Sequence, residues 1–253
     1  MGQINVTTLP GIPLINPGDD LVPIILRGLA AAALTPEPDD VVVIASKIVS
    51  KTEDRQVRLD SVEPTARAEE LAGVTGKDAR EIELMLRESV QVVRARPGLI
   101  ITRHRLGFVS ANAGIDHSNV PGGDAECVLL LPENPDATAA RLRERLKAET
   151  GVSIGVIIAD SHGRPHRMGT VGVAIGSAGL PALEDWRGRQ DLFGYVLQHT
   201  DIGLADMIAS AATLLLGQAK EGTPIVHVRG VPRMPGDGTA HDLVRPIEMD
   251  LFQ

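Results

Sequence analysis

Gly155-Val-Ile-Ile-Ala-Asp-Ser-His-Gly-Arg-Pro-His-Arg-Met-Gly169 is the most informative stretch of this chain. Residues 153–159 form a short apolar run rich in β-branched side chains, which predicts a buried strand that ends at Asp160. The carboxylate of Asp160 and the hydroxyl of Ser161 suit Mg²⁺ or Mn²⁺, which prefer oxygen ligands. The cations that follow, Arg164, His166 and Arg167, would offset the charge of a polyphosphate. An ordinary strand exit with a solvated aspartate explains this stretch equally well.

Other apolar patterns predict the remaining elements of the fold. The continuous run Val41-Val-Val-Ile-Ala45 predicts a fully buried strand. Further strands are predicted at residues 4–9, 90–95, 99–102, 108–111, 127–131, 170–175 and 225–228. Helices are predicted at residues 20–34, 64–73, 77–88, 134–150 and 201–216. The glycine-rich stretch 176–188 lacks the spacing of a dinucleotide-binding motif or a P-loop, so neither is predicted.

Composition narrows the class of ligand. The chain has 253 residues, enough for one large domain or two small ones. Aromatic residues make up only 2%, which argues against stacking platforms for single-stranded nucleic acid. The net charge of −8 argues against a general nucleic-acid or membrane surface. An anionic small molecule therefore needs a local cationic pocket.

Cysteine usage and the N-terminus bear on the compartment. Cys127 is the only cysteine, so no internal disulfide is possible, and a small buried residue is a simpler explanation for it than a catalytic thiol. The N-terminus lacks the basic and apolar regions of a signal peptide, and no apolar run approaches the length of a membrane span. These features predict a cytoplasmic protein.

Three further polar segments are candidates for ligand contacts. Lys47 and Lys51 lie four residues apart, so a helix would place them on one face as a phosphate clamp, or as two solvated lysines. The turn-rich segment 112–123 contains Asp116, a second candidate oxygen ligand, and Asn119, a candidate contact to a base, ribose or phosphate. A plain loop is the alternative there. The polar loop 218–223 follows a predicted helix and is suited to close over a ligand.

Taken together, these motifs resemble the coenzyme F-420-0:L-glutamate ligase family, which adds γ-linked glutamate to the deazaflavin coenzyme F-420. The resemblance covers nearly all of residues 4–230, and its specificity lies in the order and spacing of short motifs. Those motifs are Gly11-Ile-Pro-Leu14 with Pro17-Gly-Asp-Asp20, Ser46-Lys47 with Ser50-Lys51, Asn112-Ala-Gly-Ile-Asp116 with Ser118-Asn-Val120, Asp160-Ser-His-Gly-Arg164, Gly172 to Gly179, Asp185-Trp186 and Val226 to Gly230.

The resemblance implies a fold, a reaction and an assembly. It implies an α+β fold with a mixed sheet and two lobes, and a homodimer. It also implies that GTP and Mg²⁺ or Mn²⁺ phosphorylate the terminal carboxylate of the F-420 precursor. The amine of L-glutamate then attacks this acyl phosphate, giving an amide, GDP and phosphate. Some members also need K⁺.

Site residues follow from the matched positions. The metal ions would be surrounded by Asp116, Asp160, Ser161 and Gln218. The GTP site would be lined by Gly11, Ile12, Pro13, Leu14, Ser46, Lys47, Lys51, Asn119, Leu216, Gly217, Gln218, Ala219, Lys220, Glu221, Gly222 and Thr223. Asp116, Asp160 and Arg164 are the candidate catalytic residues, with Arg164 chosen for its local charge.

Residues 1–230 are predicted to form the ligase domain, as two intertwined α/β lobes, and residues 231–253 an extension or linker outside the core. The tail also resembles the junction in two-domain actinobacterial versions, where a flavin-binding nitroreductase-like domain follows. Two alternative functions stay open. One is another nucleotide-dependent amide ligase or a kinase on the same scaffold, and the other is a nucleotide-binding module without turnover. A scaffold protein is disfavoured because no repeat is found.

Overall fold

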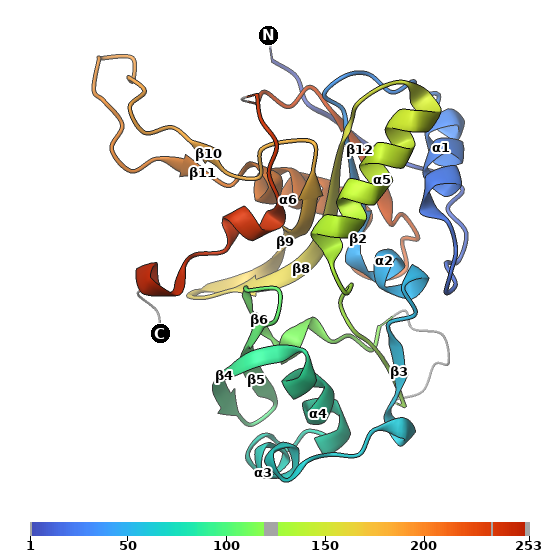
Figure 1. The fold of residues 1–253 in the computed structure, drawn as a ribbon, viewed down its shortest axis with the longest axis vertical. Helices are drawn as coiled ribbons and strands as arrows, with labels where there is room; N and C mark the ends of the chain where they lie inside the picture. The colour runs from blue at the N-terminus through green and yellow to red at the C-terminus, as the bar shows by residue number, and fades with distance from the viewer. Residues whose placement is uncertain (1, 119–125, 234, 251–253) are drawn as a thin grey trace.

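The computed structural model describes residues 2–118, 126–233 and 235–250. A five-stranded mixed sheet organises the molecule, in the order β1-β12-β2-β8-β9 (Figure 1). β2 and β8 are parallel, and the other neighbours in this sheet are antiparallel. The strands are β1 (Asn5–Thr8), β2 (Val41–Ala45), β8 (Gly155–Arg164), β9 (Arg167–Ala178) and β12 (Ile225–Arg229). The predicted α+β class and mixed sheet are confirmed, and the two intertwined lobes stay a prediction.

Helices cover both faces of this sheet because its central strands are apolar on both sides. Val42 and Ile44 pack with α1 (Leu21–Ala31) and α5 (Pro135–Thr150). Val41 and Val43 point the other way and pack with α6 (Leu204–Leu216). These four side chains are fully buried, which stabilises the fold by about 1.5–3 kcal/mol each. The sheet therefore forms the rigid centre of the molecule.

A second, smaller layer lies below the main sheet in Figure 1. It contains α3 (Ala66–Thr75), α4 (Ala79–Arg87) and a three-stranded antiparallel sheet, β4 (Ser89–Arg96), β5 (Leu99–His104) and β6 (Val109–Ala111). The strand pair β3 (Gln56–Arg58) and β7 (Cys127–Leu129) connects it to α2 (Ser46–Thr52) and the main sheet. Its core is separate, since Leu71, Ile82 and Ile100 pack together away from the main sheet.

The prediction that the central strand ends at Asp160 is wrong. β8 continues to Arg164 because β9 pairs with it along its whole length, with Asp160 opposite Val173 and Ser161 opposite Gly172. The polar half of β8 carries no apolar pattern of its own, so only the partner strand reveals that it is extended. Asp160 is therefore held within a paired strand and not in a loop.

The domain boundary predicted at residue 230 stays a prediction, but the segment after it packs partly against the core, which the sequence does not predict. Ala240 is buried at 5% exposure, in the cluster that α6 forms with the sheet. A short helical turn, η3 (Ala240–Leu243), begins with a capping box between Thr239 and Asp242, which satisfies backbone N–H groups at its start. A second turn, η4 (Ile247–Met249), follows.

Two smaller features complete the fold. The predicted helix 201–216 begins only at Leu204, because β11 (Asp201–Ile202) pairs with β10 (Glu184–Asp185). The segment between these strands projects from the body as an arm (Figure 1).

The remaining turns of 3-10 helix are η1 (Leu59–Ser61) and η2 (Asn112–Gly114). Within the described residues, no helix combines the length and apolarity needed to span a bilayer.

Candidate active site

Asp160 is positioned by the junction of β2 and α2. Because α2 starts at Ser46 without an intervening loop, its first turn lies at the end of β2, where Ala45 pairs with Ala159 of β8. The Ser46 hydroxyl consequently donates to Asp160 Oδ1 at 2.8 Å. On the other oxygen, His162 Nε2 lies 3.0 Å from Oδ2, because residues two apart in a strand share a face.

The charge of Asp160 is set by these neighbours. Burial by itself raises the pKa of this carboxyl, but His162, the Ser46 hydroxyl and the Ser161 N–H outweigh it, and the net pKa is lowered. Asp160 is therefore an anion at neutral pH, as a metal ligand must be.

Lys47, the next residue of α2, contacts Asp116. Lys47 Nζ lies 2.7 Å from Asp116 Oδ2, and the Ser118 N–H donates to Oδ1 at 2.6 Å. Burial raises the pKa of Asp116, but Lys47 and the Ser118 N–H have the larger combined effect and lower it. Since Ser46 and Lys47 are consecutive, one turn of α2 connects the two predicted acids, which come from distant parts of the chain.

The chemistry of the four predicted metal ligands fits a hard cation. Two of them are in direct contact, since Ser161 Oγ donates to Gln218 Oε1 at 3.1 Å. All four supply oxygen, which Mg²⁺ and Mn²⁺ prefer. No group of three or more His, Cys, Asp or Glu that could hold a metal occurs in the described parts of the chain. Hydroxyl and amide oxygens would thus have to complete the coordination of any ion.

Several of the predicted nucleotide-binding residues lie on α2 or in a loop attached to it. Residues 11–14 belong to a loop that is tied to the end of this helix, because the Gly18 N–H donates to the Thr52 carbonyl at 3.0 Å. Lys51 shares a side of α2 with Lys47, and burial together with the Lys47 charge lowers its pKa. Asn119 lies outside the described residues.

The segment 216–223 begins where α6 ends and approaches the site through Gln218. The Thr223 hydroxyl donates to the Leu215 carbonyl at 2.7 Å, and Glu221 accepts from the Ala219 N–H at 2.8 Å. These bonds hold a loop of irregular backbone that presents Lys220 to solvent. The role of this loop as part of a nucleotide site stays a prediction.

Arg164 is not in contact with the acids. It lies four residues beyond Asp160 on β8, about 13 Å along an extended strand. Its guanidinium donates to the Met168 carbonyl at 3.0 Å, across the turn that joins β8 to β9. His166 and Arg167 are exposed at the same turn. These cations thus form the tip of a hairpin, and their role as ligand contacts stays a prediction.

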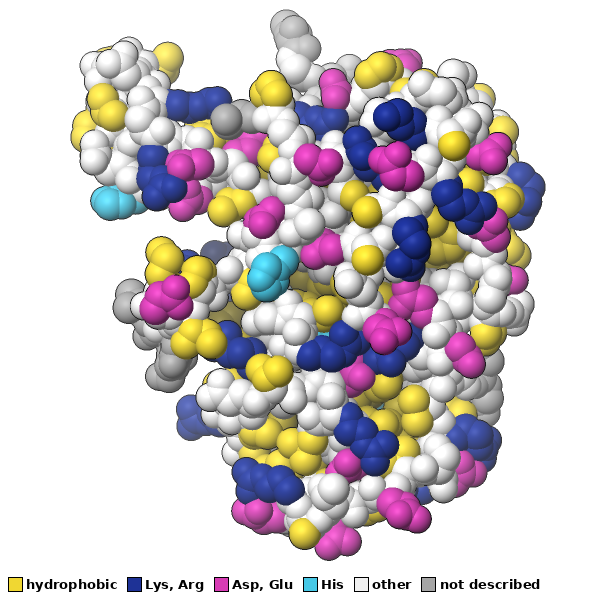
Figure 2. Space-filling view, viewed as in Figure 1, with side chains coloured by type: hydrophobic (Ala, Val, Ile, Leu, Met, Phe, Trp, Pro, Cys, Tyr) yellow, Lys and Arg dark blue, Asp and Glu magenta, His cyan; other side chains and the backbone are white. Residues whose placement is uncertain are grey.

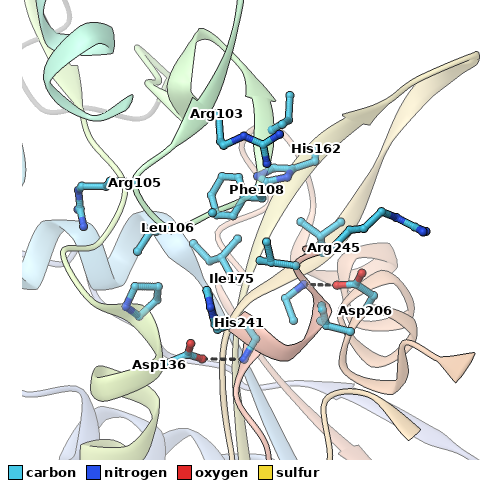
Figure 3. Close-up of a pocket in the computed structure, with 18 of the residues that line it drawn as sticks. Arg103, Arg105, Leu106, Phe108, Asp136, His162, Ile175, Asp206, His241 and Arg245 are labelled. Atoms are coloured by element: carbon cyan, nitrogen blue, oxygen red, sulfur yellow. Dashed lines mark hydrogen bonds between the residues drawn. The ribbon is translucent and has the colours of Figure 1, made fainter. Parts of the chain in front are cut away.

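A cavity of about 520 Å³ that no sequence pattern predicts lies next to His162 (Figure 3). The residues that matter most here are Arg103, Phe108, His162, Asp206 and Arg245. His162 joins the cavity to Asp160, and its ring centroid lies 4.8 Å from that of Phe108. Figure 2 shows basic side chains across the middle of the molecule, between its two layers. Arg103 directly follows the predicted strand 99–102, where a charged residue could have indicated a ligand contact, whereas Asp206 lies in a predicted amphipathic helix and gave no such indication.

With this geometry in place, comparison with known proteins becomes informative. The model of the family described as F420-0:Gamma-glutamyl ligase matches residues 11–230. The chain belongs to this family. It is therefore a ligase of the class that forms carbon–nitrogen bonds. The resemblance deduced from the short motifs is confirmed.

Archaeal relatives match over essentially the whole chain. A protein of Methanopyrus kandleri named coenzyme F420:L-glutamate ligase is 45% identical, with 100% of both chains covered. Proteins of the same name from Methanothermobacter thermautotrophicus and Archaeoglobus fulgidus are 41% and 40% identical, covering 99% of this chain and 99% and 97% of their own. The similarity to these relatives thus extends into the segment after residue 230, where the family model ends.

Proposed function

We propose that this ligase joins L-glutamate to coenzyme F-420-0 through a γ-glutamyl amide bond, using GTP and a divalent metal ion. The observation that carries this proposal is the convergence of Asp160 and Asp116 on one turn of α2, through Ser46 at 2.8 Å and Lys47 at 2.7 Å, in a chain of this family. Further glutamates can be added by the same chemistry, because each product again carries a free carboxylate.

The reaction proceeds in two balanced steps. A carboxylate oxygen of F-420-0 forms a bond to the γ-phosphorus of GTP, and the bond from that phosphorus to GDP breaks. The glutamate nitrogen then bonds to the acyl carbon, phosphate leaves with the bonding electrons, and the nitrogen releases a proton. Such transfers depend mainly on positioning and on charge stabilisation. The protein accordingly needs no nucleophile of its own.

Each part of the site has a role in this scheme. Asp116, Asp160, Ser161 and Gln218 would hold the metal, which supplies positive charge to the transferring phosphoryl group. Lys47 and Lys51 would contact the phosphates. An anion there would relieve the repulsion that now contributes to lowering the pKa of Lys51. Ser46 keeps Asp160 oriented through its hydrogen bond.

The nucleotide would lie between two loops next to α2. We assign one wall to residues 11–14 and the other to residues 216–223, with Asn119 as a further contact. Support comes from the hydrogen bonds that tie each loop to the site, Gly18 to Thr52 and Ser161 to Gln218. We also propose K⁺ as an additional ion and Arg164 as a contact to an anionic substrate group.

One incubation tests the proposed function. Protein, F-420-0, L-glutamate, GTP and Mn²⁺ are mixed, and the deazaflavin is followed by mass spectrometry. We expect a mass gain of one or more glutamyl units with an equal amount of GDP, and chelation of the metal should stop both. Amide formation without GDP release would refute the acyl-phosphate route. GDP release without a mass gain would indicate another acceptor, and a lack of GTP binding would eliminate the nucleotide site.

We further propose that the protein is a homodimer in which the projecting arm contacts the second copy. Leu192 and Phe193 are exposed at 98% and 95%, and Tyr195 at 61%, which is unusual for large apolar side chains grouped on one segment. Phe193→Ser with Leu192→Ser should shift the sedimentation coefficient towards that of a monomer. Val90→Thr, at a site on β4 that is 68% exposed, is the matched control. An unchanged dimer in the arm variant would place the interface elsewhere.

A further inference from the structure

The cavity beside Asp160 has no role in the scheme above. It lies between the β5–β6 turn, the polar half of β8, the start of α6 and the C-terminal segment, and it holds about 520 Å³ (Figure 3). His162 is part of its lining and also lies 3.0 Å from Asp160. The cavity therefore borders the place where the acyl phosphate would form.

One side of the cavity carries an acid with spare hydrogen-bonding capacity. Asp206 is in the first turn of α6, and its Oδ1 accepts from the Ala174 N–H of β9 at 2.8 Å. No hydrogen bond to its Oδ2 is found among the described residues. Burial raises the pKa of Asp206, because that single N–H and the more distant His162 do not compensate for lost water. A cation at Asp206 would supply what this carboxylate lacks.

The other acid next to α5 is already engaged. Asp136 Oδ1 accepts from the Ser177 N–H and the Ala240 N–H, both at 2.8 Å, and so ties the C-terminal segment to the sheet. Figure 3 draws the bond between Asp136 and this segment. Asp136 therefore has a structural task, and Asp206 is the acid better placed to receive a ligand.

Another part of the lining carries a guanidinium that is equally short of partners. Arg103 is only 9% exposed, its Nε is buried without a hydrogen-bond partner, and Asp250 is 3.4 Å from its terminal nitrogen. In Figure 3 its head points toward His162. By contrast, Arg105 already pairs with Glu88 at 3.0 Å and donates hydrogen bonds to the carbonyls of Pro132 and Glu133. Arg103 is thus available for an anion.

We propose that this cavity is the amino-acid site of the ligase, where Asp206 binds the ammonium group and Arg103 binds a carboxylate of the incoming glutamate. This inference rests on the proposed function. An acid and a guanidinium in one cavity match a dipolar ion, whereas a purely anionic ligand would be repelled by Asp206. His162 lines the cavity and lies 3.0 Å from Asp160, so the cavity adjoins the predicted metal site. The ammonium group gives one proton to Asp206 before its nitrogen, which then carries a lone pair, attacks the acyl carbon.

The decisive variant is Asp206→Asn. The amide oxygen can still accept from the Ala174 N–H, so the link between α6 and β9 is kept while the negative charge is lost. Because a hydrogen bond to a charged group disappears, we expect the KM for L-glutamate to rise about 10- to 100-fold. The KM values for GTP and F-420-0 should stay within about twofold, since a charge-assisted contact to the amine concerns glutamate alone. Asp201→Asn, an exposed acid outside the cavity, is the control.

A second variant identifies the anion at Arg103. Arg103→Lys keeps the charge but removes the planar fork that binds a carboxylate through two nitrogens. A higher KM for L-glutamate alone supports the proposal. A higher KM for F-420-0 alone would assign Arg103 to the acceptor's own anionic groups and overturn that half of it.

The failure of this inference can be distinguished from failure of the proposed function. If the wild type adds glutamate and Asp206→Asn has an unchanged KM for it, the amino-acid site is refuted while the function stands. If the wild type adds no glutamate, calorimetric titration of L-glutamate into the protein with GTP and Mn²⁺ tests the site directly. Binding that Asp206→Asn abolishes supports the site, and a wild type that binds no glutamate overturns it.

Discussion

Asp160 lies 3.0 Å from His162 and Asp206 lines the same cavity as His162, yet the surroundings of the two carboxyls shift their pKa values in opposite directions. Burial disfavours the charged form of each. At Asp160 the Ser46 hydroxyl at 2.8 Å and His162 at 3.0 Å more than compensate, and the pKa is lowered. At Asp206 the single backbone N–H at 2.8 Å does not outweigh the effect of burial, and the pKa is raised. The number and charge of the partners, and not burial, decide which carboxylate is ready for a metal and which lacks a cation.

The largest effect is expected from replacing Asp160, the acid whose partners lower its pKa. Asp160→Asn should lower glutamyl transfer by about 10³-fold, the scale of losing a main electrostatic group at the reaction centre. Asp60→Asn, an exposed acid paired only with Arg58, should leave turnover unchanged. The rate of GDP release with F-420-0 and L-glutamate is the measurement. Full activity in Asp160→Asn would show that the negative charge of Asp160 is not needed for glutamyl transfer.

The close packing of α6, which carries Asp206, against the β8–β9 hairpin, which carries Asp160, depends on Gly172. This residue pairs with Ser161, and a Cβ there would lie 2.6 Å from the Ala209 carbonyl of α6, which is closer than contact distance. Gly172→Ala should therefore push α6 from β9 and reduce the free energy of unfolding by about 1–3 kcal/mol. Gly163→Ala, where a Cβ meets nothing within 4 Å, is the control. Urea denaturation compares the two, and equal midpoints would show that α6 can shift without cost.

A smaller effect is expected when Asp160 loses one of the hydrogen bonds that lower its pKa. Ser46→Ala removes one hydrogen bond from this carboxylate, so its pKa should rise towards that of Asp206. Losing a group that orients a metal ligand commonly costs 10–100-fold, and we expect metal affinity to fall by about tenfold. Titration with Mn²⁺ measures this. Ser61→Ala, whose hydroxyl contacts only the Arg58 carbonyl, should bind metal as the wild type does.

The smallest effect is on stability as a function of pH. A carboxyl with a raised pKa stabilises the fold below its unfolded pKa, and that contribution is lost as the pH rises through the folded pKa. Asp206→Asn should therefore have a higher Tm than the wild type at pH 7, with a difference that shrinks as the pH falls. Asp160→Asn should show the opposite sign, since the pKa of Asp160 is lowered. A change in Tm in the same direction in both variants would contradict the contrast between Asp160 and Asp206.

Local sequence signals predicted the elements whose causes are local. The helix predicted from residue 20 begins at Leu21, and Asp20 caps it, since its carboxylate accepts from the Val22 N–H two residues later. The apolar run 41–45 forms β2 with the predicted bounds, because a fully buried strand needs no information beyond its own side chains. Asp116, Asp160 and Ser161 were predicted as oxygen ligands from local residue chemistry and Gln218 from the family resemblance, and the structure brings Ser161 to Gln218.

Tertiary structure decided what depends on distant partners. The polar half of β8 is a strand because β9 pairs with it, and Ala240 is buried because Asp136 holds its backbone. Asp160 and Asp116 contact consecutive residues of α2, Ser46 and Lys47, although no local pattern links the two acids. Residue types and their order thus sufficed to recognise the ligase family. The cavity of Asp206 arises only when a helix, a hairpin and the C-terminal segment pack together, because long-range contacts leave no periodic trace in the sequence.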